Sequence, residues 1–185
     1  MKIRLLSLLM LFSTLSLANT VEIETLDNDG FNQVLVRSGN LFVAGQPTEA
    51  GLKRLQESGV TTVVNLRTIG EMDNREIVPF DEAAVVEDLG MDYVHIPAGG
   101  PDTPYSPEML ERFAQTLNQA QGKVLLHCTV AWRASHLYTA YLTRYQGLSL
   151  EEAQRIGKSI NLGTLPLEGF LGEKLELVIA PDTDD

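Results

Sequence analysis

Hydrophobic positions follow two spacings along the chain, and the change from one to the other marks the predicted elements. Runs of mostly apolar or β-branched residues, typical of buried strands, occupy 40–47, 60–67, 91–98 and 123–128. Apolar residues at helical spacing occupy 49–59, 81–90, 106–122, 133–147 and 149–161. This alternation predicts an α/β fold, a three-layer sandwich with a central, mainly parallel sheet of about four to five strands.

Residues at the helix ends support these boundaries. Thr48, Ser106 and Ser149 stand where N-caps are expected, and Pro107 follows Ser106 at the first helical position. Glycines close several of the helical segments, as expected of residues that tolerate a left-handed backbone.

The first 20 residues, MKIRLLSLLMLFSTLSLANT, have the layout of a secretory leader. Lys2 and Arg4 precede an apolar stretch at about 5–17, and small residues follow around a cleavage point. We expect a signal peptide at 1–18 and an exported protein of the periplasm or cell envelope. An uncleaved anchor helix is the alternative, although the stretch is short for a membrane span. Because no later segment is apolar enough to cross a bilayer, we expect no membrane span in the mature chain.

The remaining length fits one domain with a core of its own. We expect an irregular, polar lead-in at 19–37, the folded domain at 38–180 and a solvated acidic tail at 181–185. The net charge is −11 and becomes −13 when Lys2 and Arg4 are removed with the leader. An acidic surface repels phosphate backbones, so nucleic-acid binding is not expected, and an anion site has to be a local feature.

The single cysteine lies in KVLLHCTVAWRAS, residues 123–135. A lone Cys in an exported protein is either a small buried hydrophobe or a reactive thiol. Cys128 ends a predicted strand, and a helix begins about five residues later. The N–H groups and dipole of a helix start favour a thiolate and a bound oxyanion, and Arg133 adds a fork for two oxygens. These residues favour the reactive thiol.

Other loops are expected at the same edge of the sheet, because ligands of parallel sheets bind beyond the carboxyl ends of the strands. They follow Arg67 and include GGPDTPY, residues 99–105. Arg67 either reaches this edge or lies on the surface, and the surface position is the expected one. Gln46 either lines the pocket or forms the turn.

The order His-Cys, short loop, Arg and hydroxyl residue resembles the signature of cysteine-dependent protein tyrosine and dual-specificity phosphatases. The wider chain is similar to a bacterial subgroup, the phosphatase-like domain of beta-lactamase-hydrolase-like proteins. The resemblance covers roughly residues 38–160 and rests on LFVAGQPTEAGLKRLQESGVTTVVNLR, MDYVHIPAGG and KVLLHCTVAWRAS. It implies a dual-specificity-phosphatase-like fold.

The resemblance also implies roles for the reacting groups. Cys128 would attack phosphorus and form a phosphocysteine intermediate, while Arg133 would bind the equatorial oxygens. Asp102 would protonate the leaving oxygen, unless it is a plain turn residue. The substrate would be a phosphorylated protein or a small phosphate ester, with no metal or cofactor required.

Supporting roles follow for the neighbours of the cysteine. His127 would orient the loop and stabilise the thiolate, unless it is a strand-end histidine satisfied by backbone. Ser135 would support the departing thiolate. The phosphate-binding loop would consist of Thr129, Val130, Ala131, Trp132 and Arg133.

The loop departs from the phosphatase signature in two ways. Four residues separate Cys128 from Arg133, one fewer than in most tyrosine phosphatases, and none of them is glycine. A left-handed turn is expected near Ala131, where a Cβ costs on the order of 1–2 kcal/mol. A rhodanese-like sulfurtransferase and a catalytically weak phosphate- or sulfate-binding module are therefore the alternatives. The His before Cys128 and the loop that carries Asp102 favour the phosphatase.

Overall fold

The computed structural model describes residues 21–163 and 167–175 of the chain. Six strands form one sheet in the order β1-β2-β3-β6-β4-β5, so that β6 lies between β3 and β4. The strands are β1 (Glu24–Thr25), β2 (Leu35–Ser38), β3 (Leu41–Ala44), β4 (Val60–Asn65), β5 (Asp92–His95) and β6 (Lys123–His127). The four strands from β3 to β5 run parallel, and β1 and β2 add an antiparallel edge.

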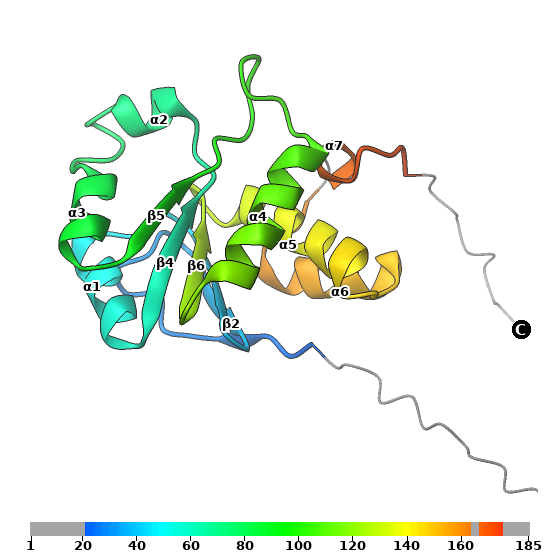
Figure 1. Cartoon of the computed structure of the whole chain (residues 1–185), viewed down its shortest axis with the longest axis horizontal. Helices are drawn as coiled ribbons and strands as arrows, with labels where there is room; N and C mark the ends of the chain where they lie inside the picture. The colour runs from blue at the N-terminus through cyan, green and yellow to red at the C-terminus, as the bar shows by residue number, and fades with distance from the viewer. Residues whose placement is uncertain (1–20, 164–166, 176–185) are drawn as a thin grey trace, which may run out of the picture.

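Helices cover both faces of the sheet, which confirms the predicted three-layer architecture (Figure 1). They are α1 (Glu49–Glu57), α2 (Ile69–Asp73), α3 (Glu82–Asp88), α4 (Pro107–Gln119), α5 (Trp132–Tyr145), α6 (Leu150–Ile160) and α7 (Leu167–Leu171). Helices α1 and α3 pack on one face, and α4 to α7 lie on the other. Figure 1 shows α2 and the loop between β5 and α4 projecting beyond the same edge of the sheet.

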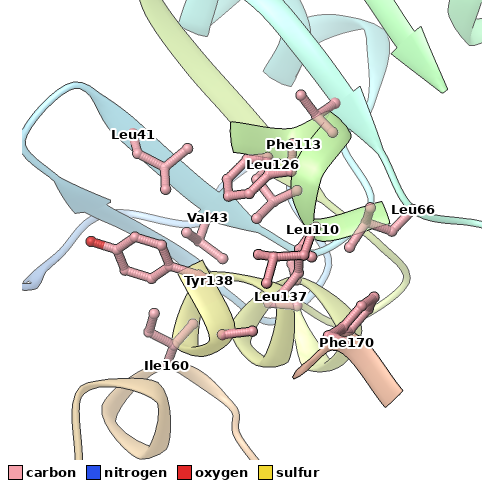
Figure 2. Close-up of a cluster of buried hydrophobic side chains, with 14 of the residues drawn as sticks. Leu41, Val43, Leu66, Leu110, Phe113, Leu126, Leu137, Tyr138, Ile160 and Phe170 are labelled. Carbon is pink, nitrogen blue, oxygen red and sulfur yellow. The ribbon is translucent and has the colours of Figure 1, made fainter. Parts of the chain in front are cut away.

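The core consists of two layers because successive strand residues point to opposite faces. In β3, Leu41 and Val43 face the layer of α4 to α7, whereas Phe42 and Ala44 face α1 and α3. Figure 2 shows the first layer, in which Leu126 of β6 lies among side chains from β3 and the helices. A buried side chain of this size contributes about 1.5–3 kcal/mol, so these layers stabilise the position of β6.

The prediction of an irregular lead-in at 19–37 is wrong for two short segments, because β1 lies within it and β2 begins within it. Residues 35–38 form β2, which pairs with β3 across a tight turn at Gly39 and Asn40, where Gly39 has φ 57°. Leu35 and Val36 are buried on opposite faces, but the polar residues around them hide this short pattern in the sequence. The sheet therefore has six strands, more than the four to five expected. The predicted leader at 1–18 and acidic tail at 181–185 lie outside the described residues.

The predicted helices and parallel strands are confirmed to within a few residues. Thr48 and Ser149 cap their helices as expected, whereas Ser106 occupies the N-cap position without a side-chain hydrogen bond. Two short helices were not predicted: α2 in the polar loop after Arg67, and α7 near the C-terminus. Across residues 21–163 and 167–175, no helix has the length and apolar character that a membrane span requires.

The backbone packs closely at Gly45, where β3 ends beside the cysteine loop. Its N–H donates to the carbonyl of Val34, and Gly45 forms an isolated antiparallel bridge with Val130. A Cβ added at Gly45 would lie 1.8 Å from the carbonyl oxygen of Asn32 and 3.1 Å from that of Thr129. Only a residue without a side chain therefore fits between these two segments.

We predict that Gly45→Ala lowers the free energy of unfolding by about 2 kcal/mol, because the backbone has to move to admit the methyl group. Urea denaturation of the purified protein measures this loss. Gly70→Ala is the matched control, since nothing lies within 4 Å of its added Cβ. Equal losses in the two variants would contradict the close approach at Gly45.

Candidate active site

Cys128 directly follows β6, which lies between two parallel neighbours, and lines a cavity of about 490 Å³. The cavity is lined by Thr68, Glu71, Gly99, Gly100, Tyr105, Cys128, Thr129, Val130, Trp132 and Arg133. The cysteine is 1% exposed and packs with the core, yet it also faces this cavity. The thiol is thus buried from bulk water, as one sequence-based alternative expects, and it also lines the cavity that Arg133 lines.

The loop after Cys128 connects β6 to the start of α5. Ala131, the residue before α5, adopts a left-handed conformation with φ 61°, as the sequence predicted near this position. No described side chain caps α5, whereas side chains cap α1, α2, α3 and α6. The N–H groups of the first turn of α5 have no intrahelical acceptor and are available to an anion in the cavity.

Neighbouring segments hold the loop in place through its carbonyl groups. The carbonyl of Thr129 accepts from the backbone N–H of Gln46 and from Asn32 Nδ2, both at 3.0 Å. Asn161 Nδ2, just after α6, donates to the carbonyl of Val130 at 2.6 Å. These contacts turn the carbonyl groups outward, away from the place where an anion would bind.

Arg133 is fixed by a carboxylate and two backbone carbonyls. Its Nη1 donates to Glu71 Oε2 at 2.8 Å, and its Nη2 donates to Glu71 Oε1 at the same distance. Nη1 also donates to the carbonyls of Ala98 and Leu66, at 2.9 and 3.2 Å. Burial alone would lower the pKa of Arg133, but the hydrogen bonds and charge of Glu71, together with the neighbouring Cys128 and Tyr105, outweigh it and the pKa is raised. The guanidinium therefore remains a preorganised positive charge.

Glu71 was missed in the sequence. It lies in α2 and forms a capping box with Thr68, whose backbone N–H donates to Glu71 Oε2 at 2.8 Å. Thr129 Oγ1 donates to the other oxygen at 3.0 Å. Burial would raise the pKa of Glu71, but the hydrogen bonds and charge of Arg133 and the bonds from Thr68 and Thr129 lower it to about 2. The sequence T-I-G-E at 68–71 is a capping-box pattern that could have indicated the helix, although not its partner.

Arg67 lies inside the protein, so the surface position expected from the sequence is wrong. Its side chain is 2% exposed, and Nη1 donates to Gln46 Oε1 at 2.9 Å. Its Nε is 3.5 Å from Glu71 Oε1, but the N–H makes no hydrogen bond within the described chain. Burial lowers the pKa of Arg67. Gln46 thus has a structural role beneath the site, holding Arg67 beside Glu71.

His127 is fully buried and does not line the cavity. Its Nε2 is 2.9 Å from Oε1 of Glu82, a carboxylate that is also buried. Nε2 is therefore paired with a carboxylate rather than with backbone, whereas Nδ1 is buried and has no hydrogen-bond partner among the described residues. Glu82 was also missed, because a glutamate in the first turn of a predicted helix ordinarily faces water.

Asp102 and Ser135 do not contact the cysteine pocket directly. Asp102 is exposed and lines a neighbouring cavity that shares Thr68, Gly99 and Gly100 with the cysteine pocket. Ser135 is buried in α5, and its hydroxyl donates to the carbonyl of Trp132 at 2.8 Å. The roles that the resemblance implies for both residues remain predictions.

Two aromatic side chains line the mouth of the pocket. Trp132 contacts His136 edge-on, with ring centroids 4.9 Å apart, and Tyr105 packs in the same manner on Phe170 at 5.1 Å. Burial raises the pKa of Tyr105. The two aromatic side chains and the fixed arginine favour a ligand that carries both an anionic group and a flat apolar group.

The chemistry available in this pocket is that of a thiol beside an anion-binding cradle. Cys128, Arg133 and the first turn of α5 adjoin the same cavity, so an oxyanion bound there would be within the same space as the thiol. Within residues 21–163 and 167–175, no cluster of three or more His, Cys, Asp and Glu side chains is arranged to hold a metal ion.

Solved structures of similar shape include phosphatases. A candidate phosphatase of the DUF442 group from Shewanella putrefaciens CN-32 has a TM-score of 0.58 and 28% identity, covering 78% of this chain and 91% of its own. TpbA from P. aeruginosa, solved with pTyr, has a TM-score of 0.54 and 21% identity, covering 75% of this chain and 81% of its own. At that lower identity the likeness shows the fold alone.

Sequence comparison gives the family. A beta-lactamase hydrolase-like protein of Agrobacterium fabrum is 33% identical over 98 residues, which are 53% of this chain and 22% of the relative. This chain therefore corresponds to about a fifth of that protein's length. The family model described as "DSP-PTPase phosphatase fused to NAD+ Kinase" matches residues 14–167. Because this match spans most of the sequence, the chain belongs to the DSP-PTPase phosphatase family.

Proposed function

We propose that the protein hydrolyses phosphomonoesters through a phosphocysteine intermediate on Cys128. The observation that carries the proposal is the convergence of Cys128, Arg133 and the uncapped start of α5 on one cavity. Family membership supports a phosphatase rather than a sulfurtransferase or a binding module. Arg133 and the N–H groups at the start of α5 would supply what phosphoryl transfer requires of a protein, namely positioning of the substrate and stabilisation of its negative charge.

The reaction has two steps in this proposal. The Cys128 thiolate attacks phosphorus, an S–P bond forms, and the P–O bond to the leaving group breaks. Water then attacks the phosphocysteine, an O–P bond forms, the S–P bond breaks, and inorganic phosphate leaves. Arg133 and the N–H groups of α5 bind the equatorial oxygens in both transition states. Ser135 would have to turn its hydroxyl from the carbonyl of Trp132 to support the departing thiolate.

Asp102 is the proposed acid that protonates the leaving oxygen in the first step. It lies on the loop that shares Gly99 and Gly100 with the rim of the cysteine pocket. Both glycines have positive φ, and Thr103 ties the loop through its bonds to Gly99. A rotation about these glycines would carry the carboxyl group over the pocket.

Aryl phosphates, including phosphotyrosine in a protein, are the proposed substrate class. Tyr105 and Trp132 form the pocket walls, and aromatic side chains favour flat leaving groups by stacking and edge contacts. TpbA of P. aeruginosa, which shares the fold, has been solved with pTyr. Small phosphate esters with an apolar body fit the same description.

We predict that Cys128→Ser lowers phosphate release from 4-nitrophenyl phosphate by at least about 10³-fold, because a serine hydroxyl is a far weaker nucleophile at neutral pH. Arg133→Lys should lower kcat/KM by about 10²-fold, since a point charge cannot replace the fork. Arg144→Lys, in the last turn of the same helix, is the matched control and should keep full activity.

Two other results, each from its own measurement on the wild type, would overturn the proposed reaction. Sulfur transfer from thiosulfate to cyanide without phosphate release would identify a sulfurtransferase. Binding of sulfate or a phosphopeptide by the wild type, with no turnover of aryl phosphates, would identify a binding module.

We predict that Asp102→Asn slows hydrolysis of phenyl phosphate by about 10²-fold and leaves 4-nitrophenyl phosphate nearly unchanged, because a poor leaving group depends on protonation. Steady-state kinetics on the two esters measure the difference. Asp92→Asn, at the far end of β5, is the control. Equal slowing of both esters would exclude the acid role.

We predict that Glu71→Gln loosens Arg133 and lowers kcat/KM for aryl phosphates by roughly tenfold.

Glu71 also contributes to stability, because its pKa of about 2 lies below the usual 4.5. This contribution, about 3 kcal/mol, is present above pH 4.5 and is lost as the pH falls toward 2. Urea denaturation across this range should show the wild type approaching the variant. A constant gap at all pH values would exclude ionisation of Glu71 as its source.

A further inference from the structure

A second cavity, of about 510 Å³, lies beside the cysteine pocket. Thr129 of the cysteine loop lines both cavities. Arg67 lines the second cavity and pairs with Glu71, which lines the cysteine pocket, with 3.5 Å between Nε and Oε1. The two cavities are therefore neighbours that share a wall made of Thr129 and this ion pair.

Apolar atoms supply most of the lining of the second cavity. Its walls come from the lead-in to β2, from the start of α1 and from the segment 77–80 between α2 and α3. The apolar residues among them are Phe31, Pro47, Ile77, Pro79 and Phe80. A concave site of this size with mainly apolar walls is typical of a binding site for an apolar group.

Ile77 stands out among these residues because it is 50% exposed. Across residues 21–163 and 167–175, the large apolar residues with comparable exposure are Ile69, Ile77 and Tyr145. Two of the three, Ile69 and Ile77, line cavities that adjoin the cysteine pocket. Single exposed apolar side chains are ordinary, but their concentration around one concave site indicates a surface that binds a partner.

The arginine of the second cavity does not make it an anion site. Arg67 Nη1 donates to Gln46 Oε1 at 2.9 Å. Burial lowers the pKa of Arg67, whereas the nearby charges of Glu71 and Glu82 raise it. Glu49 also lines the cavity. Because carboxylates of the protein already balance this positive charge, the apolar walls decide which group the cavity receives.

The wall between the two cavities is held in a fixed position. Asn32 and Gln46 line the second cavity, and both donate to the carbonyl of Thr129 at 3.0 Å. The hydroxyl of Thr129 donates to Glu71 on the side of the cysteine pocket. A wall fixed from both sides keeps the two cavities at a constant separation, so it selects one spacing between the groups that occupy them.

We propose that the second cavity is a specificity site that receives an apolar side chain of a phosphoprotein, close in sequence to its phosphorylated residue. The inference rests on the proposed function, because the phosphorylated residue has to occupy the cysteine pocket. The ring of a small aryl phosphate lies on one side of Thr129 only. A polypeptide carries a side chain every 3.2–3.4 Å when extended and can place two of them in neighbouring cavities.

Binding of fluorescent phosphopeptides to Cys128→Ser tests the inference without relying on turnover. The reference peptide has one phosphotyrosine among alanines, and each further peptide has leucine at one position, up to two residues before or after the phosphotyrosine. Fluorescence polarisation gives Kd for Cys128→Ser alone, with Ile77→Ser added and with Tyr145→Ser added. Tyr145 is the matched control, because it is 46% exposed but ends α5, whereas the cysteine loop precedes the first turn.

We predict that leucine at one of these positions tightens binding about tenfold relative to the alanine peptide, because the second cavity buries its side chain. Ile77→Ser should reduce this gain to about twofold or less and leave the Kd of the alanine peptide unchanged. Tyr145→Ser should keep the full gain. With Cys128 present, Ile77→Ser should hydrolyse 4-nitrophenyl phosphate at the wild-type rate, since this ester occupies the cysteine pocket alone.

Equal binding of all the peptides would overturn the inference, as would a leucine gain that persists in Ile77→Ser or disappears in Tyr145→Ser. Dioctanoyl phosphatidic acid that binds more tightly than every peptide, and loses this advantage in Ile77→Ser, would identify a lipid as the occupant instead. A wild-type dimer that Ile77→Ser dissociates, measured by analytical ultracentrifugation, would identify a second copy of the chain.

Turnover of 4-nitrophenyl phosphate by the wild type separates this inference from the proposed reaction. Turnover without a leucine gain would leave the phosphatase and exclude the specificity site. A leucine gain without turnover would exclude the phosphatase and leave an apolar site beside a phosphotyrosine-binding pocket.

Discussion

The fork between Arg133 and Glu71 is the interaction on which the candidate site depends. It joins the first turn of α5 to a short helix that follows β4, and it fixes the guanidinium at the cavity that Cys128 also lines. Because both η nitrogens bind one carboxylate, the guanidinium keeps a single orientation before any ligand arrives. An anion that enters the pocket then meets a charge that is already placed, and little reorganisation is needed during the reaction.

The site holds strain and buried charge that the fold has to stabilise elsewhere. Ala131 has a left-handed backbone that costs on the order of 1–2 kcal/mol, and Arg67, Glu82 and His127 are each almost fully buried. The two apolar layers on either side of β6 offset these costs, since they contain most of the large side chains of the core. A rigid centre of the sheet thus supports a loop that is unfavourable by itself.

Local patterns predicted most of the fold. Apolar runs located β3, β4, β5 and β6, and capping residues such as Thr48 and Ser149 located the helix starts, because these signals act between residues close in the chain. The β2 strand escaped detection because it is short and surrounded by polar residues. The helix α2 escaped because its capping box lies in an otherwise polar loop, where helical spacing of apolar residues is absent.

The sequence by itself determined the alternation of the four parallel strands with the longer helices, the position of Cys128 and Arg133 around a short loop, and the family resemblance. Tertiary structure decided which carboxylates serve that loop. Glu71 lies 62 residues before Arg133, and Glu82 lies 45 residues before His127. Partners so far apart meet because parallel strands bring distant segments to one edge of the sheet. The sequence does not show whether a charged residue on a predicted helix faces water or a buried partner. That depends on how the distant segments pack against one another.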